Sequence, residues 1–115
     1  MRRLLLALLF PLPALALSSA AQEFMEISAQ LEPVQCEKRQ LRRQLVMAQV
    51  ERRDEDLKRL RARVAELNRD KETARLERRL AELEKRISDG KGGTRDPEDL
   101  QAISFQQRQA FYRCE

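Results

Sequence analysis

The sequence predicts an all-α protein: a long helix of the coiled-coil type and a shorter C-terminal antiparallel helix form a helical hairpin after a cleavable signal peptide. Three observations carry this prediction. No internal Gly or Pro interrupts residues 33–88, which are mostly Leu, Ala, Glu, Arg, Lys and Gln, the strongest helix formers. Their apolar residues recur at alternating spacings of three and four. A short apolar segment follows two arginines at the N-terminus.

Residues 1–21 have the three parts of a secretory signal. Arg2 and Arg3 precede an apolar segment, which ends in Ser18-Ser19-Ala20-Ala21. The segment is shorter than a membrane span and contains two prolines, so a signal that is removed is favoured over a transmembrane anchor. We expect cleavage between Ala21 and Gln22, with a product that is soluble and located in the bacterial periplasm or secreted.

The residues that follow divide into a lead-in and a long helix. Residues 22–32 are expected to be a mobile lead-in, and residues 33–88 a continuous charged amphipathic helix. Pro33 suits the first helical position, because its missing N–H costs nothing there. Gly90 suits the left-handed position after the last turn. The run Glu51 to Asp56 contains no helix breaker, which favours an unbroken helix.

A turn and a second helix complete the predicted hairpin. Residues 89–96 contain all three glycines and have a usual length for a connection between antiparallel helices. The C-terminal helix is expected over residues 97–115, where Asp96 caps the free N–H groups and Pro97 presets φ.

The long helix carries two apolar stripes that face opposite sides. The first stripe is predicted to face a partner protein and consists of Leu57, Leu60, Val64 and Leu67. The second stripe begins nine residues later, which is two and a half turns, so one partner cannot cover both. We expect this second stripe to pack in the hairpin, together with residues of the C-terminal helix: Leu76, Leu80, Leu83, Ile87, Leu100, Ile103 and Phe111.

Cys36 and Cys114 are the candidate disulfide cysteines. An internal bond is incompatible with an unbroken helix, because folding back at residues 89–95 leaves the two cysteines roughly 50 Å apart. Two arrangements bring them together: a three-helix monomer that turns back near Arg53-Asp54, and its swapped antiparallel dimer, which the absence of a helix breaker favours. A parallel dimer with Cys36 joined to Cys36, and free thiols, remain as alternatives.

Composition argues against several classes of function. The chain has no histidine, so the usual general base and the commonest metal ligand are missing, and we expect neither an enzyme nor a metal or cofactor site. Loss of Arg2 and Arg3 with the signal lowers the formal net charge from +4 to +2. Arg and Glu interleave, as in Glu51 to Asp56, which is typical of a solvated helix face and not of a nucleic-acid-binding surface.

These features together favour an exported structural or interaction protein. It is expected to self-associate as a homo-oligomer or to dock onto a helical protein of the cell envelope, because a chain of this length and shape buries little of its own apolar surface. The alternative is a holdase-like chaperone, or a protein that binds lipids or other ligands. A third, weaker hypothesis is contact of Arg-rich faces with lipopolysaccharide or membrane, which strong salt dependence would reveal.

Overall fold

The computed structural model describes residues 17–89 and 97–114, which form four α-helices and no strand. The helices are α2 (Ser19–Val50), α3 (Asp54–Arg69), α4 (Lys71–Asp89) and α5 (Pro97–Arg113). The all-α fold class is therefore confirmed. The predicted Gly-rich turn at residues 89–96 lies almost entirely outside the described residues.

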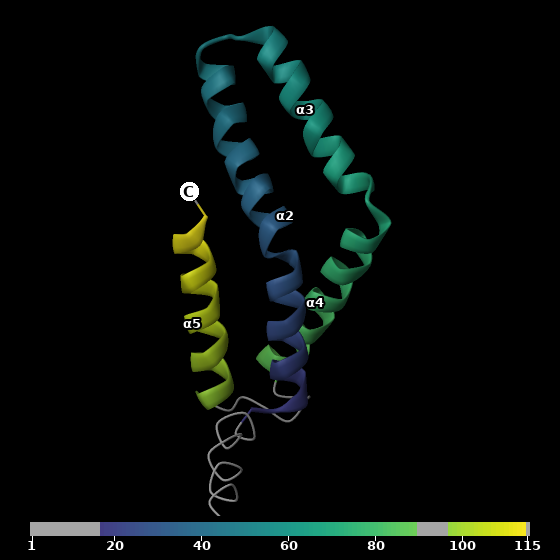
Figure 1. Cartoon of the computed structure of the whole chain (residues 1–115), viewed down its shortest axis with the longest axis vertical. Helices are drawn as coiled ribbons and strands as arrows, with labels where there is room; N and C mark the ends of the chain where they lie inside the picture. The colour runs from purple at the N-terminus through teal and green to yellow at the C-terminus, as the bar shows by residue number, and fades with distance from the viewer. Residues whose placement is uncertain (1–16, 90–96, 115) are drawn as a thin grey trace, which may run out of the picture.

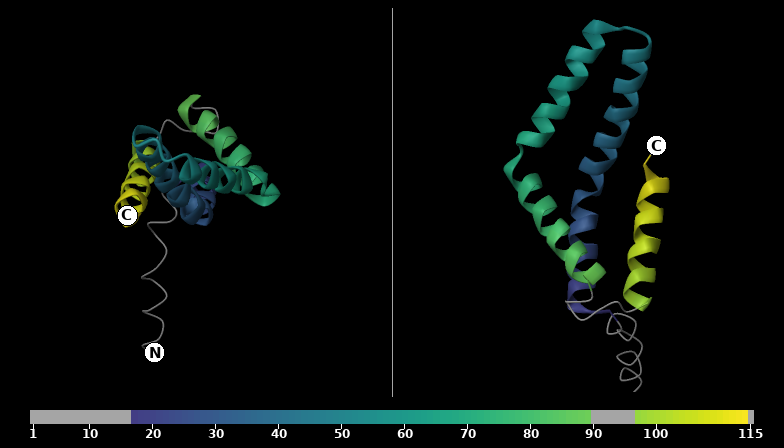
Figure 2. Two further views of the ribbon diagram at one scale, coloured as in Figure 1. Left: turned by 90° about the horizontal axis from the view of Figure 1, so that it is seen from above. Right: turned by 180° about the vertical axis from the view of Figure 1, so that it is seen from behind.

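Helix α2 is the centre of the fold and contacts the three other helices (Figure 1). α3 and α4 return antiparallel along it, and α5 flanks it on another side (Figure 2). The apolar residues form two separate clusters. The larger cluster joins α2 to α4 and α5, and its buried members are Ala20, Ala21, Phe24, Ile27, Leu31, Leu83, Ile87 and Ile103. The smaller cluster joins α2 to α3, and its buried members are Leu41, Ala48 and Leu60.

The prediction of a mobile lead-in at residues 22–32 is wrong, because this segment forms the first half of α2. Ser18 caps the helix: its side-chain oxygen accepts a hydrogen bond from the backbone N–H of Ala21 at 3.1 Å. Phe24, Ile27 and Leu31 follow at spacings of three and four and are buried, which holds this segment as a helix. Pro33 lies inside α2 and not at its start.

The prediction of an unbroken helix over residues 33–88 is also wrong, and the first break follows Val50. Arg52 has φ 54°, in the left-handed region. The N–H of Arg53 donates to the carbonyl of Ala48 at 2.9 Å and the N–H of Arg52 to that of Gln49 at 3.2 Å, the hydrogen-bond pattern of a Schellman motif. Glycine usually occupies the position that Arg52 takes. Because arginine stands there instead, no glycine in the sequence indicates this turn.

Replacing Arg52 by glycine is expected to raise the free energy of unfolding by up to about 1 kcal/mol, because a side chain in the left-handed region costs about that much. Urea denaturation of the Arg52→Gly variant, compared with Arg53→Gly in the same turn, measures the effect. Arg53 has φ −91°, where glycine relieves no steric cost, and it forms ion pairs with Glu51 and Asp56. Equal destabilisation by both substitutions would contradict this assignment of strain.

The second break, at Asp70, separates α3 from α4. The carboxylate of Asp70 accepts a hydrogen bond from the backbone N–H of Thr73 at 2.9 Å, which caps the first turn of α4. Bonds from Thr73 to this carboxylate lower the pKa of Asp70. The break removes the conflict between the two apolar stripes, because each helix can now turn its own stripe toward α2.

Helix α5 runs parallel to α2 with a constant offset of 81 residues. Asp99 accepts from the backbone N–H of Ser18, the Gln106 amide donates to the carbonyl of Met25, and Arg113 pairs with Glu32. These contacts recur every seven residues on both helices, the spacing at which two helices keep the same faces together. The predicted C-terminal helix thus exists over Pro97–Arg113. It packs mainly against α2, and not against the end of the long helix as a hairpin would require.

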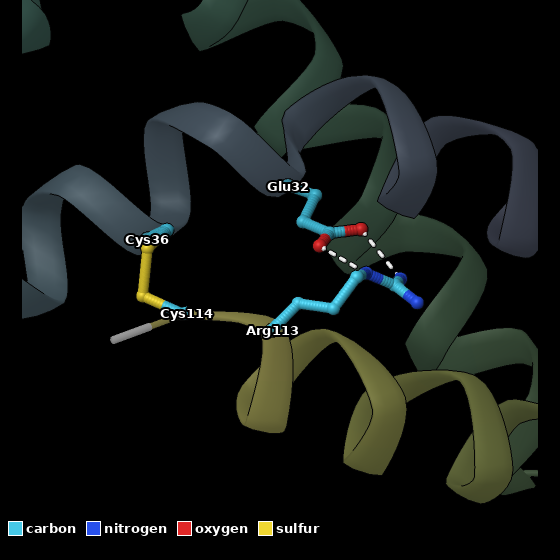
Figure 3. Close-up of a disulfide and its surroundings, with 4 residues drawn as sticks. All are labelled: Glu32, Cys36, Arg113 and Cys114. Carbon is cyan, nitrogen blue, oxygen red and sulfur yellow. Dashed lines mark hydrogen bonds and ion pairs between the residues drawn. A yellow bond between two sulfur atoms is a disulfide. The ribbon is translucent and has the colours of Figure 1, made fainter.

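A disulfide joins Cys36 of α2 to Cys114, which directly follows α5, with a Cα–Cα distance of 5.5 Å (Figure 3). Glu32, one helical turn before Cys36, forms a bidentate ion pair with Arg113, the residue before Cys114, with N–O distances of 2.9 and 2.8 Å. Both cysteines of the chain are used within it. The turn after Val50 makes this bond within one chain possible, as in the alternative that folds back near Arg53-Asp54, and the break at Asp70 adds a further helix to that arrangement.

Candidate partner-binding surface

The stripe of Leu57, Leu60, Val64 and Leu67 does not face a partner in this structure. Leu60 is buried and the other three are partly buried, all in the small cluster against Leu41, Leu45 and Ala48 of α2. The turn after Val50 folds α3 onto α2, so this stripe is covered from within the chain. The prediction that it faces a partner is therefore corrected.

The predicted hairpin-packing residues divide into two groups. Leu83, Ile87 and Ile103 are buried in the large cluster, and Leu76 and Leu80 pack against it. Leu100 and Phe111 are exposed. The division follows from the parallel packing of α5 on α2, which turns Asp99, Ile103 and Gln106 inward and leaves the opposite side of α5 uncovered.

The uncovered side of α5 carries the largest exposed apolar residues of the described chain. Phe105 is 57% exposed and Tyr112 is 70% exposed. Phe111 and Tyr112 contact each other edge to face, with ring centroids 5.8 Å apart. We call this side the α5 outer face, defined by Leu100, Gln101, Ser104, Phe105, Arg108, Phe111 and Tyr112. Under the holdase alternative, the terminal aromatic residues Phe105, Phe111 and Tyr112 of this face are among those expected to hold non-native chains or lipids.

A second exposed apolar group lies at the end of α2, beside the turn. Val46, Met47 and Val50 are all at least half exposed. None of the large exposed apolar side chains in the described ranges belongs to α3 or α4, because the outer faces of these two helices are charged. Within the described ranges, the large apolar side chains that are well exposed thus lie on α5 and at the end of α2.

A shallow groove of about 540 Å³ lies between α4 and α5, with α2 as its floor. Phe24 and Leu80 supply apolar surface, and the guanidinium of Arg39 lies 5.5 Å from the centre of the Phe111 ring, a cation–π contact. The side-chain oxygen of Gln106 is buried in this region without a hydrogen-bond partner among the described residues. The groove joins the α5 outer face at Phe111, so the two form one continuous region.

Ion pairs connect α2 to each of the other helices. Glu37 pairs with Arg63 of α3, Glu23 with Arg79 of α4, and Glu32 with Arg113 of α5. Hydrogen bonds from these arginines lower the pKa values of Glu37, Glu23 and Glu32 below the ordinary value of 4.5. All three pairs lie at the surface, where such pairs contribute modestly to stability.

The protein is expected to lose stability in acid as these pairs are lost. Because the three glutamate pKa values are lower in the folded state, their contribution is present above the ordinary value of 4.5 and disappears as pH falls through the folded-state values. Urea midpoints measured from pH 7 to pH 3 are expected to stay level down to about pH 5 and then decline. A triple Glu→Gln variant should flatten this decline, and a decline of unchanged size would contradict the assignment.

Two specific kinds of site or segment are absent from the described residues. No group of three or more Cys, Asp or Glu side chains among them is placed to hold a metal ion. None of the described helices combines the length and the apolar character needed to cross a membrane.

Comparison with known proteins finds no matching family model, no similar curated protein and no similar solved structure.

Proposed function

We propose that this chain is an exported, non-enzymatic interaction protein that binds a helical segment of another cell-envelope protein through the α5 outer face. The observation that carries the proposal is the exposure of aromatic side chains. Of the four aromatic residues in the described ranges, Phe105, Phe111 and Tyr112 are exposed on this face and Phe24 alone is buried. Aromatic residues are enriched at binding surfaces, where they supply large rigid contacts.

The shape and length of the face suit a helix. Leu100 and Phe111 are eleven residues apart and Phe105 and Tyr112 are seven apart, so each pair lies on one line along α5. Together the two lines span Leu100 to Tyr112, a length of roughly 18 Å or about three helical turns. An amphipathic helix that lies along this face would supply apolar residues at the same spacing.

The charge of the face favours a partner other than a second copy of the chain. Arg108 lies in the middle of the face and has no ion pair with any described residue. Its neighbours Leu100, Gln101, Ser104 and Phe105 carry no carboxylate. A partner helix with an Asp or Glu among its apolar residues would pair with this guanidinium, which favours one orientation of binding.

Export is supported by the leader-like N-terminal sequence and by the disulfide between Cys36 and Cys114. Disulfides persist in oxidising compartments such as the bacterial periplasm and are rare in the cytosol. A periplasmic or secreted location therefore belongs to the proposal.

Site-specific photocrosslinking in cells tests the interaction. A photoreactive residue at position 105 is expected to give one discrete adduct, whereas the same residue at the exposed position Arg61 of α3 gives none. Arg108→Glu should reduce the yield of a probe at Leu100 by about tenfold, and Arg108→Lys should preserve most of it. Non-reducing gels and circular dichroism check that each variant keeps its disulfide and its helices.

Three outcomes would contradict the proposal. An adduct with twice the mass of the chain would indicate self-association through this face. Many adducts of different mass would indicate a holdase. Equal adducts from positions 105 and 61, or none from either, would remove the α5 outer face as a binding surface.

The second candidate function is a holdase-like chaperone, which a separate observation favours. Val46, Met47 and Val50 are exposed at the end of α2, remote from the α5 outer face in sequence, and Met side chains adapt to varied apolar partners. A holdase suppresses the aggregation of unrelated unfolding proteins at stoichiometric ratios. Loss of that activity on substitution of these three residues by Ser, with crosslinking at position 105 unaffected, would favour this second function.

A further inference from the structure

The side chain of Asp99 lies at the point where α5 begins beside the start of α2. It is 0% exposed. One carboxylate oxygen, Oδ1, accepts a hydrogen bond from the backbone N–H of Ser18 at 3.1 Å. The other oxygen, Oδ2, is buried and has no hydrogen-bond partner among the residues that the structure describes.

A buried carboxylate with an unpaired oxygen is costly, and such groups are ordinarily satisfied by a cation or further donors. The positive ends of two helix dipoles favour the charge of Asp99, since it lies in the first turn of α5 and next to the N-cap of α2. They leave Oδ2 without a donor. A cationic group placed beside the Ser18 N–H would complete the site.

We propose that export creates this cation by cleavage of the Ala16–Leu17 bond, and that the new α-ammonium group of Leu17 pairs with Asp99. Hydrolysis by a signal peptidase adds one water, breaks the C–N bond, and leaves a carboxylate on Ala16 and an ammonium on Leu17. The nitrogen of Leu17 is three covalent bonds from that of Ser18, which already contacts Asp99. This inference rests on the export part of the proposed function.

The residues before this bond fit a signal peptidase. Ala14-Leu15-Ala16 is an Ala-x-Ala sequence, with small residues at both recognition positions. Arg2 and Arg3 supply the charged start, and the apolar segment from Leu4 to Pro13 has a length within the usual range.

Cleavage after Ala21 would instead remove part of the folded core. Ala20 and Ala21 are buried, and Leu17 packs against the large cluster. The N-cap Ser18 and the hydrogen bond to Asp99 would be lost with them. A cut at Leu17 keeps all of these contacts, whereas the cut first expected from the sequence deletes them.

Intact mass of the exported protein tests the position of the cut. A chain that begins at Leu17 supports the inference. A chain that begins at Gln22 overturns it while leaving export intact, and retention of Met1 overturns both. Two matched substitutions extend the test. Ala16→Gln should block processing, because a cut before Leu17 needs a small residue at position 16. Ser19→Gln should leave a Leu17 start unchanged, because Ser19 is exposed and only a cut after Ala21 would need a small residue there.

The pairing with Asp99 is tested on the mature chain. The pKa of the Leu17 α-ammonium, measured by NMR after ¹³C-methylation, is expected to lie about one pH unit above the ordinary value of about 8 for this group. Asp99→Asn should return it to the ordinary value, and Glu98→Gln, one residue away on an exposed position, should not. An unshifted pKa in the native mature chain, or equal effects of both substitutions, would overturn the pairing.

Discussion

Replacing Cys36 and Cys114 by serine is expected to lower the free energy of unfolding by roughly 4 kcal/mol, the largest effect of any change considered. The bond closes a sequence separation of 78 residues, so it removes many conformations from the unfolded chain. It also fixes the end of α5, whose other contacts with α2 include Ile103 in the core, two hydrogen bonds, one surface ion pair and a cation–π contact. Guanidinium denaturation of the double variant under non-reducing conditions measures the loss.

Reduction of the native protein with dithiothreitol should produce nearly the same loss as the double substitution. Arg113→Gln serves as a control next to the bond, and it is expected to have a much smaller effect because its partner interaction is at the surface. A loss below about 1 kcal/mol for the double variant would show that α5 is held by its other contacts.

Truncating Leu83 to alanine is expected to cost about 3 kcal/mol, the second largest effect. Leu83 is 0% exposed and lies in the large cluster where α4 meets α2. Removal of its side chain leaves a cavity that neighbouring helices fill only in part. The measurement is again equilibrium denaturation, with helicity followed by circular dichroism.

Leu100→Ala is the matched control, because it is the same substitution at a position that is 45% exposed on the α5 outer face. Its expected cost is below about 1 kcal/mol. Both residues belong to the predicted hairpin-packing set, so equal costs would contradict the division of that set into packed and exposed residues.

Helix content and the positions of the apolar stripes were predictable, because they depend on local composition and spacing. The cysteine spacing placed a possible turn near Arg53-Asp54, where the turn lies, but an unbroken helix was favoured because Arg52 takes the left-handed conformation that glycine normally supplies. One signal for it was present. Asp54, Glu55 and Asp56 form the acidic first turn typical of a helix start, and they immediately follow the turn.

The break at Asp70 also had a sequence signal, the half-turn reversal between the stripes at Leu67 and Leu76. A reversal of this kind is resolved either by partners on opposite faces or by a break, and the sequence alone does not choose between them. In the structure the helix breaks at Asp70, and a capping hydrogen bond between Thr73 and Asp70 stabilises the start of α4. Which side of α5 is exposed depends on the parallel packing of α5 against α2. That packing arises from contacts between residues 81 positions apart, which local sequence patterns do not show.

The position of the disulfide divides the length of α2 into two parts with different neighbours. Up to Cys36, α2 lies beside α5, whereas the 14 residues from there to Val50 extend for about 21 Å alongside α3. The small cluster of the second part shares no buried residue with the large one. Insertion or deletion of the same number of helical turns in α2 and α3 would therefore change how far the turn after Val50 extends from the large cluster. The attachment of α5 would be unaffected, so the length of this extension can evolve independently of the α5 contacts.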